Sequence, residues 1–199
     1  MNKREEALIF SQTVPGTGGR LDYAEHLCDL ASRIPDNSVI VEIGTQNGGS
    51  AATMGILLKD KNVKIYCVDP CFIKVEDRPE SYKTYAEIYP VYTLDEVLKM
   101  FKSMDLDKTI TCLPGTSEEI LSKWNGEKFD MLFIDGCHTY EAVLIDMMWL
   151  QYAKDKCMLV LDDWIIGVEK ACVEQLNKFP GFIKRTDHTF WPIYYTRGY

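Results

Sequence analysis

The sequence contains no apolar run long enough to cross a bilayer. Its most apolar stretches, such as Met158–Leu161, are far shorter than the roughly 20 residues that a spanning helix needs. The first residues, Met1–Phe10, carry several charges and contain no apolar signal core. We therefore expect no membrane span and a cytoplasmic location.

Basic residues are in deficit, and cysteine motifs are missing. The chain has 22 Lys and Arg against 30 Asp and Glu, a net charge of −8, which disfavours a nucleic-acid partner because phosphate binding needs a basic surface. Its seven cysteines form no CxxC pair. Cys67, Cys112 and Cys157 fall in strand-like runs, so we expect reduced cysteines that pack as small hydrophobic residues.

Repeats, low-complexity tracts and interdomain linkers are also missing, and 199 residues suit one domain. What the chain does contain is an alternation of short apolar runs with amphipathic stretches. The predicted strands cover residues 39–43, 64–68, 109–113, 130–134 and 157–161, with a closing hairpin of 182–185 and 193–196. The predicted helices cover residues 50–59, 116–124, 140–151 and 168–179, with another that begins at Thr93.

Continuous apolar strands between amphipathic helices are typical of a parallel sheet that is covered on both faces. We predict an α/β fold with a doubly wound, mostly parallel, seven-stranded Rossmann-like sheet and an antiparallel C-terminal hairpin. Within one domain, 1–199, we expect an N-terminal loop and helix (1–35), a core (38–165) and a closing helix and hairpin (166–199). Ligands of such sheets bind at the carboxyl ends of the strands.

The first strand ends in a glycine-rich loop, Glu42-Ile43-Gly44-Thr45-Gln46-Asn47-Gly48. A dinucleotide fingerprint would need glycine where Glu42 stands, so an NAD-dependent oxidoreductase is disfavoured. An acid two residues before Gly44 instead suits a cationic or amine-bearing ligand. Asp69 ends the second strand, where a carboxylate commonly binds ribose hydroxyls; a solvated turn before Pro70 is the alternative.

Acidic residues also follow two later strands. Asp135 ends one strand and Asp162-Asp163 end the next, so three carboxylates are expected to converge. Crowded carboxylates resist ionisation unless a cation joins them, and oxygen ligands suit Mg²⁺ or Mn²⁺. His138 follows three residues after Asp135, and imidazole is the side chain that most often serves as a general base. Helix capping by the aspartates or by His138 stays open as an alternative.

The ordered motifs VEIGTQNGGS, YCVDP, LPGTSEE, FIDGCHTYEAVLIDMMWL and MLVLDDW resemble the class I S-adenosylmethionine-dependent methyltransferases. More narrowly, residues 38–165 resemble the branch of macrolide and aminocoumarin sugar O-methyltransferases. The resemblance implies that Glu42 and Gly44 lie against the methionine part of S-adenosylmethionine, Asp69 binds its ribose and Ser117 lies near its adenine. The remaining residues expected at the cofactor are Thr45, Asn47, Ser50 and Asp135.

The same resemblance implies that Asp135, Asp162 and Asp163 bind Mg²⁺ or Mn²⁺ and that Asp135 and His138 are catalytic, with His138 as the base. Related sequences often read Asp-Gly-Asp-His, and Cys137 replaces the second acid here. The loop with Gly18 and Gly19 is expected to fold over the cofactor. Tyr82, Tyr85, Tyr89 and Tyr92 form either a carbohydrate platform or a buried helix face.

The expected activity is O-methylation of a hydroxyl on a sugar or glycan, with assistance from a divalent metal. A catechol-type O-methyltransferase of a small aromatic diol is the nearest alternative. A non-catalytic protein that binds an adenosyl cofactor is the alternative from another class. Nucleic-acid N-methylation is disfavoured because the Asn/Asp-Pro-Pro-Tyr motif is missing where Ile134-Asp135-Gly136 stands. The partner is expected to be a small molecule or glycan, and a homo-oligomer stays open.

Overall fold

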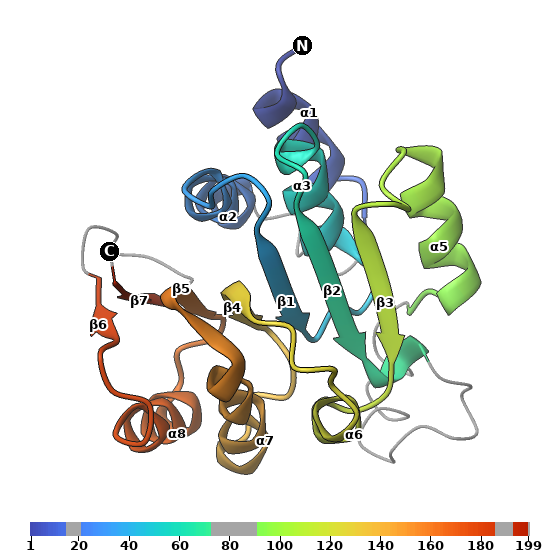
Figure 1. Ribbon diagram of the computed structural model, residues 1–199. Coiled ribbons are helices and arrows are strands. Elements are labelled where there is room, and N and C mark those ends of the chain that lie inside the picture. Colours follow the sequence, from blue (N-terminus) through green and yellow to red (C-terminus); the bar gives the residue numbers. More distant parts are fainter. Residues whose placement is uncertain (15–20, 73–90, 186–192, 199) are drawn as a thin grey trace.

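The computed structural model describes residues 1–14, 21–72, 91–185 and 193–198 (Figure 1). The strands are β1 (Val39–Ile43), β2 (Lys64–Asp69), β3 (Ile110–Pro114), β4 (Phe129–Ile134), β5 (Ala153–Leu161), β6 (Ile183–Lys184) and β7 (Ile193–Arg197). The helices are α1 (Lys3–Ser11), α2 (Leu21–Ser32), α3 (Gly49–Leu58), α5 (Leu94–Ser103), α6 (Ser117–Ser122), α7 (Tyr140–Asp146) and α8 (Ile166–Leu176). Two 3₁₀ turns are η1 (Pro70–Phe72) and η3 (Met147–Tyr152).

The strands form one seven-stranded sheet in the order β3-β2-β1-β4-β5-β7-β6. β1 to β5 run parallel, and β7 is antiparallel to both β5 and β6. The predicted fold class is therefore confirmed. The closing hairpin is not simply added at the edge, because β7 lies between β5 and β6. The strand order reverses between β1 and β4, which is where ligands of such sheets bind.

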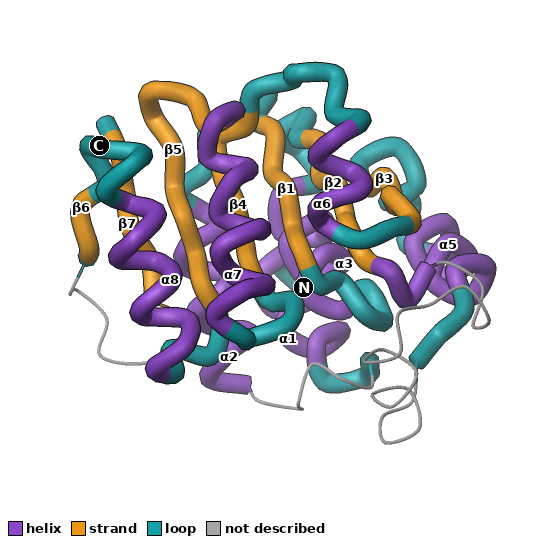
Figure 2. The backbone as a smooth tube through the Cα atoms, turned by 90° about the horizontal axis from the view of Figure 1, so that it is seen from below, coloured by secondary structure: helices purple, strands orange, loops and turns teal. Residues whose placement is uncertain are grey.

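Helices cover both faces of the sheet, so the central strands β1 and β4 are buried on two sides. α1, α2, α3 and α5 lie on one face, and α6, α7 and α8 lie on the other (Figures 1 and 2). Side chains alternate along a strand, so the two faces of the sheet have separate cores. Ile40 packs in the core beneath α1, α2, α3 and α5, while Val39 and Val41 pack in the core beneath α6, α7 and α8. Cys67 and Cys157 are buried and free, and Cys112 is half-buried and free, as the sequence predicts.

Local sequence signals fix several helix ends. Thr93 with Glu96 forms the predicted capping box before α5, and Thr116 with Glu119 forms the one before α6. The helix expected over 140–151 is wrong in its second half, where the α-helix ends at Asp146 and η3 follows. There the Gln175 Nε2 atom donates a hydrogen bond of 2.9 Å to the Leu144 carbonyl. In a continuing α-helix this carbonyl would accept from the backbone N–H four residues later.

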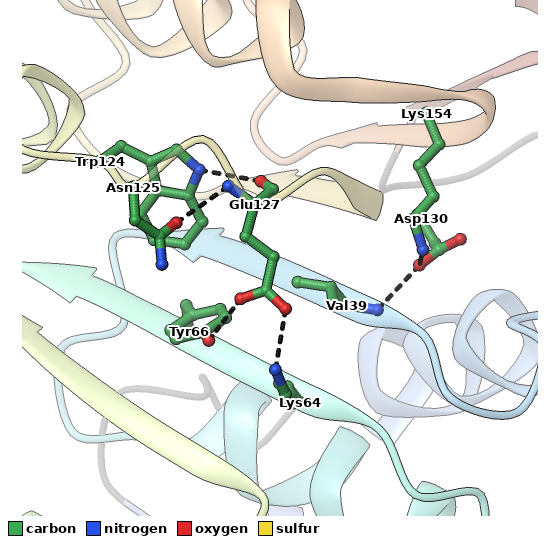
Figure 3. A network of polar contacts seen from close by, with 8 residues as sticks. All are labelled: Val39, Lys64, Tyr66, Trp124, Asn125, Glu127, Asp130 and Lys154. Carbon is green, nitrogen blue, oxygen red and sulfur yellow. Dashed lines mark hydrogen bonds and ion pairs between the residues drawn. The ribbon is translucent and has the colours of Figure 1, made fainter.

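The amino-terminal edge of the sheet is held by a polar network between strand starts (Figure 3). Asp130 accepts hydrogen bonds from the backbone N–H of Val39 at 2.8 Å and from Lys154 Nζ at 2.7 Å. Nearby, Glu127 accepts from Lys64 Nζ at 2.8 Å and from the Tyr66 hydroxyl at 2.7 Å. These bonds tie β1, β2, β4 and β5 together at the edge opposite to the candidate site.

Candidate active site

The carboxyl ends of four neighbouring strands, β2, β1, β4 and β5, are aligned by backbone hydrogen bonds that continue the sheet. The N–H of Gly44 donates to the Val68 carbonyl at 2.9 Å, that of Asp135 to Ile43 at 2.8 Å, and that of Asp162 to Ile134 at 2.9 Å. Residues that follow β1, β4 and β5 therefore start side by side. This alignment is the reason why acids that are far apart in the sequence meet at one edge.

Gly44 makes the close approach of β1 and β4 possible. Its φ is +91°, and a Cβ atom placed there would lie 2.1 Å from the carbonyl oxygen of Asp135. No other residue fits this position without moving the Asp135 backbone. The glycine that the sequence marks as an expected cofactor residue thus also sets the position of Asp135.

Glu42 is a fully buried acid on β1, directly before this loop. Ser50 of α3 donates a hydrogen bond to its Oε1 atom, and the Cys67 thiol lies 3.6 Å from its Oε2 atom. Burial raises the pKa of Glu42 to about 7, although hydrogen bonds from Ser50, Thr45 and Cys67 act to lower it. No basic side chain in the described residues pairs with this carboxyl group. Such a group fits a ligand that brings its own positive charge.

Asp69 holds the glycine loop from the end of β2. Its Oδ2 atom accepts a hydrogen bond of 2.6 Å from the backbone N–H of Gln46, whose φ of +48° is unusual outside glycine. Asn47 is buried as well, and its Oδ1 atom accepts from the backbone N–H of Tyr92 at 2.7 Å. Thr45 is buried beside them. The side chains of Asn47 and Ser50 thus bond to the protein, which shapes the loop.

Ser117, the residue expected near the adenine, begins α6. Its hydroxyl oxygen accepts a hydrogen bond of 2.9 Å from Trp149 Nε1 and also bonds with the carboxyl group of Asp146. Asp146 is only 4% exposed, and this burial raises its pKa to about 7. Nothing in the sequence marks Asp146, because it lies within an ordinary helical stretch. The Ser117 side chain is therefore already committed to protein partners.

Asp135, His138 and Asp162 form a compact cluster of possible metal ligands. One oxygen of each aspartate and one ring nitrogen of His138 all lie within 4.8 Å of one another. Burial, more than any neighbouring charge, raises the pKa of both Asp135 and Asp162. Asp135 raises the pKa of Asp162 further, whereas the hydrogen bond between the two carboxyl groups acts to lower the pKa of Asp135. Two such carboxyl groups hold a proton near neutral pH unless a cation replaces it.

Asp163 lies on the other side of the His138 ring. Its Oδ2 atom is 3.0 Å from His138 Nδ1, whereas His138 Nε2 lies 3.6 Å from Asp135 Oδ1. Asp163 has a φ of +46° and a side chain that is 53% exposed. Of the expected metal ligands, the structure thus groups Asp135 and Asp162 with His138. It places Asp163 on the imidazole, and the assignment of Asp163 to a metal stays a prediction.

Tyr23 of α2 is a site residue that the sequence analysis missed. Its hydroxyl group donates a hydrogen bond of 3.3 Å to Asp135 Oδ2, across 112 positions of sequence. Nothing in the surrounding helical stretch marks this tyrosine. The loop with Gly18 and Gly19, like Tyr82, Tyr85 and Tyr89, lies outside the described residues.

The strand order, the antiparallel β7 and the acid-bearing strand ends define a class I methyltransferase fold. Residues 41–164 match the protein family described as "Methyltransferase domain". The chain belongs to this family, and the predicted recognition of a class I S-adenosylmethionine-dependent methyltransferase is confirmed. No curated protein sequence matches the chain.

Several solved structures share the fold at low sequence identity. The O-methyltransferase NovP superposes with a TM-score of 0.68 at 20% identity, over 89% of this chain and 80% of that one. The methyltransferase PaMTH1 of Podospora anserina, solved with bound SAH, has a TM-score of 0.66 at 14% identity, over 99% and 88%. CalS11, a TDP-rhamnose 3'-O-methyltransferase of calicheamicin biosynthesis, has a TM-score of 0.61 at 16% identity, over 98% and 93%.

The described helices are all too short or too polar to cross a membrane.

Proposed function

We propose that this protein transfers the methyl group of S-adenosylmethionine to a hydroxyl group of a sugar or glycan, with assistance from a divalent metal ion. One observation supports this above all others. Asp135, His138 and Asp162 converge within 4.8 Å at the strand ends that also carry Glu42 and Gly44. A methyl donor and a hydroxyl acceptor would have to meet between these groups.

The cofactor would be held by the residues around the glycine loop. Bound S-adenosylmethionine supplies an electrophilic methyl group on a positively charged sulfur. Glu42, buried without a basic partner among the described residues, suits the charged methionine part. Gly44 leaves room for the close approach of a ligand, and Asp69 suits the ribose hydroxyls.

The donor set of the acid cluster fits Mg²⁺ or Mn²⁺. Two carboxylates with an adjacent imidazole offer hard oxygen ligands and no thiolate. When bound, the ion lowers the pKa of a hydroxyl group and fixes its oxygen. Asp135 and Asp162 would bind this ion, and the raised pKa values of both carboxyl groups show how strongly the site without it favours protons.

His138 is arranged as a base whose Nε2 atom is the free nitrogen. The 3.0 Å contact with Asp163 Oδ2 fits an N–H on Nδ1, which leaves the lone pair on Nε2. This Nε2 atom is buried and has no hydrogen-bond partner among the described residues, and it points towards Asp135. In this arrangement Asp163 orients the base, while His138 accepts the proton of the acceptor hydroxyl.

The choice of a sugar hydroxyl rests on the motif resemblance and on the similar folds. NovP is an O-methyltransferase and CalS11 acts on a TDP-rhamnose hydroxyl. A catechol-type acceptor is the second candidate, since the same metal ligands would serve it. A histidine base, where catechol-type enzymes often use a lysine, favours an aliphatic hydroxyl group as the acceptor over an aromatic diol.

The test is methyl transfer from labelled S-adenosylmethionine to nucleotide sugars, free glycosides and catechols, with and without a chelator. We expect turnover with a sugar only in the presence of a divalent ion. His138→Ala should lower turnover by about 10²–10⁴-fold, the usual contribution of a general base. Asp162→Asn should abolish it while SAH still binds.

Glu174→Gln is the matched control, because it makes the same acid-to-amide change on the exposed side of α8. Full turnover after exhaustive chelation would refute the metal mechanism. Methylation of catechols alone would replace the sugar by an aromatic diol.

A further inference from the structure

Tyr23 is a side chain of α2 that hydrogen-bonds to the acid cluster. All other groups of the cluster follow β4 or β5, whereas α2 precedes β1 in the chain. The Tyr23 hydroxyl donates to Asp135 Oδ2 at 3.3 Å. A role for this contact rests on the proposed function, because it concerns the same reaction centre.

The contact divides the two oxygen atoms of Asp135 between different partners. Oδ2 accepts from Tyr23, and Oδ1 lies 3.6 Å from His138 Nε2. Because a carboxylate is planar, a hydrogen bond that fixes one oxygen also fixes the direction of the other. With Tyr23 in place, Asp135 therefore directs Oδ1 towards His138 Nε2.

The surroundings keep Tyr23 a phenol, which can only serve Asp135 as a donor. Burial of the hydroxyl raises the pKa of Tyr23 well above its ordinary value, and the charges of Asp135, Asp162 and Glu42 raise it further. The hydroxyl is thus near both the metal-binding acids and the cofactor acid. A hydrogen-bond donor at this place orients a metal-binding carboxylate in the way that outer partners of metal ligands do.

We propose that Tyr23 is a positioning residue, which holds Asp135 Oδ2 so that Oδ1 is directed into the metal site. The role belongs to the hydroxyl group, and the ring supplies only packing. Removing the hydroxyl alone should therefore weaken metal binding while the fold and the cofactor site remain.

The experiment compares Tyr23→Phe with Tyr66→Phe in the full chain. The Tyr66 hydroxyl also donates to a carboxylate, Glu127 Oε2 at 2.7 Å, but at the opposite edge of the sheet (Figure 3). Each protein is titrated with Mn²⁺, followed by electron paramagnetic resonance, and with SAH by calorimetry. We expect Tyr23→Phe to bind Mn²⁺ about 10-fold more weakly, as other losses of outer partners do. SAH affinity should change less than about twofold, and Tyr66→Phe should bind both like the wild type.

Equal Mn²⁺ affinity in Tyr23→Phe and the wild type would overturn the proposal. A parallel loss of Mn²⁺ binding, SAH binding and melting temperature would also overturn it, because it would show a packing role. If the wild type itself binds no Mn²⁺, the metal step of the proposed function fails. Tyr23 is then judged by crystal structures of both proteins: a rotated Asp135 carboxylate in Tyr23→Phe supports the proposal, and an unchanged one refutes it.

Discussion

Metal binding at the acid cluster should depend steeply on pH. Asp135 and Asp162 are close enough to share a proton, and burial raises the pKa of each well above the range of an exposed aspartate. A divalent ion needs both carboxylates in their charged forms. Binding near neutral pH must therefore release the shared proton, and acid competes with the ion.

The size of the effect follows from that one proton. Below the raised pKa of the pair, each pH unit lowers the apparent affinity about tenfold for each proton that is released. Between pH 8 and pH 6 we expect Mn²⁺ binding to weaken by about 10²-fold. Ordinary exposed aspartates would give almost no change over this range, because they are ionised throughout.

The assay is a Mn²⁺ titration by electron paramagnetic resonance at pH 6, 7 and 8. Calorimetry at pH 7 in buffers with different ionisation enthalpies counts the released protons. Asp162→Asn is the matched variant: it removes the carboxyl group that shares the proton but leaves Asp135 buried, so its weaker Mn²⁺ binding should keep only part of the pH dependence. A wild-type affinity that is equal at pH 6 and pH 8, with no proton release, would refute the coupled acid pair.

Three further perturbations test other parts of the structure. Gly44→Ala should abolish SAH binding, measured by calorimetry, because its Cβ atom would lie 2.1 Å from the Asp135 carbonyl oxygen; normal binding would contradict this geometry. Asp146→Asn should flatten the loss of stability with rising pH. Burial raises the folded-state pKa of Asp146 to about 7, so its contribution is full below pH ~4 and disappears as the pH passes 7. Between pH 6 and pH 8, the free energy of unfolding measured with urea should fall by about 1–2 kcal/mol more in the wild type than in the variant. Glu127→Gln should lower the melting temperature by about 2–4 °C while SAH binding stays normal, and a loss of SAH affinity would argue against separate edges of the sheet.

Most of the fold could be predicted from local patterns of amino acids. Apolar runs of strand length, separated by amphipathic stretches, are enough to predict a parallel sheet covered on both faces, because each element must bury its apolar side. Thr93 and Thr116 mark helix starts because a capping box satisfies backbone N–H groups within four residues. Glu42, Asp69 and Asp135 could be picked out because each lies at or near the carboxyl end of a predicted strand, where such sheets bind ligands.

Which of these side chains touch, and how they are oriented, depends on packing between elements that are far apart in the sequence. The Leu144 carbonyl bonds to a side chain 31 residues away, so the end of α7 was beyond any local pattern. The contact between Asp163 and the His138 ring depends on the positive φ of Asp163. The dipeptide Asp162-Asp163 does not by itself predict this backbone conformation. Tyr23 of α2 reaches Asp135 across 112 positions of sequence, and contacts across such distances in sequence arise from packing rather than from local propensity.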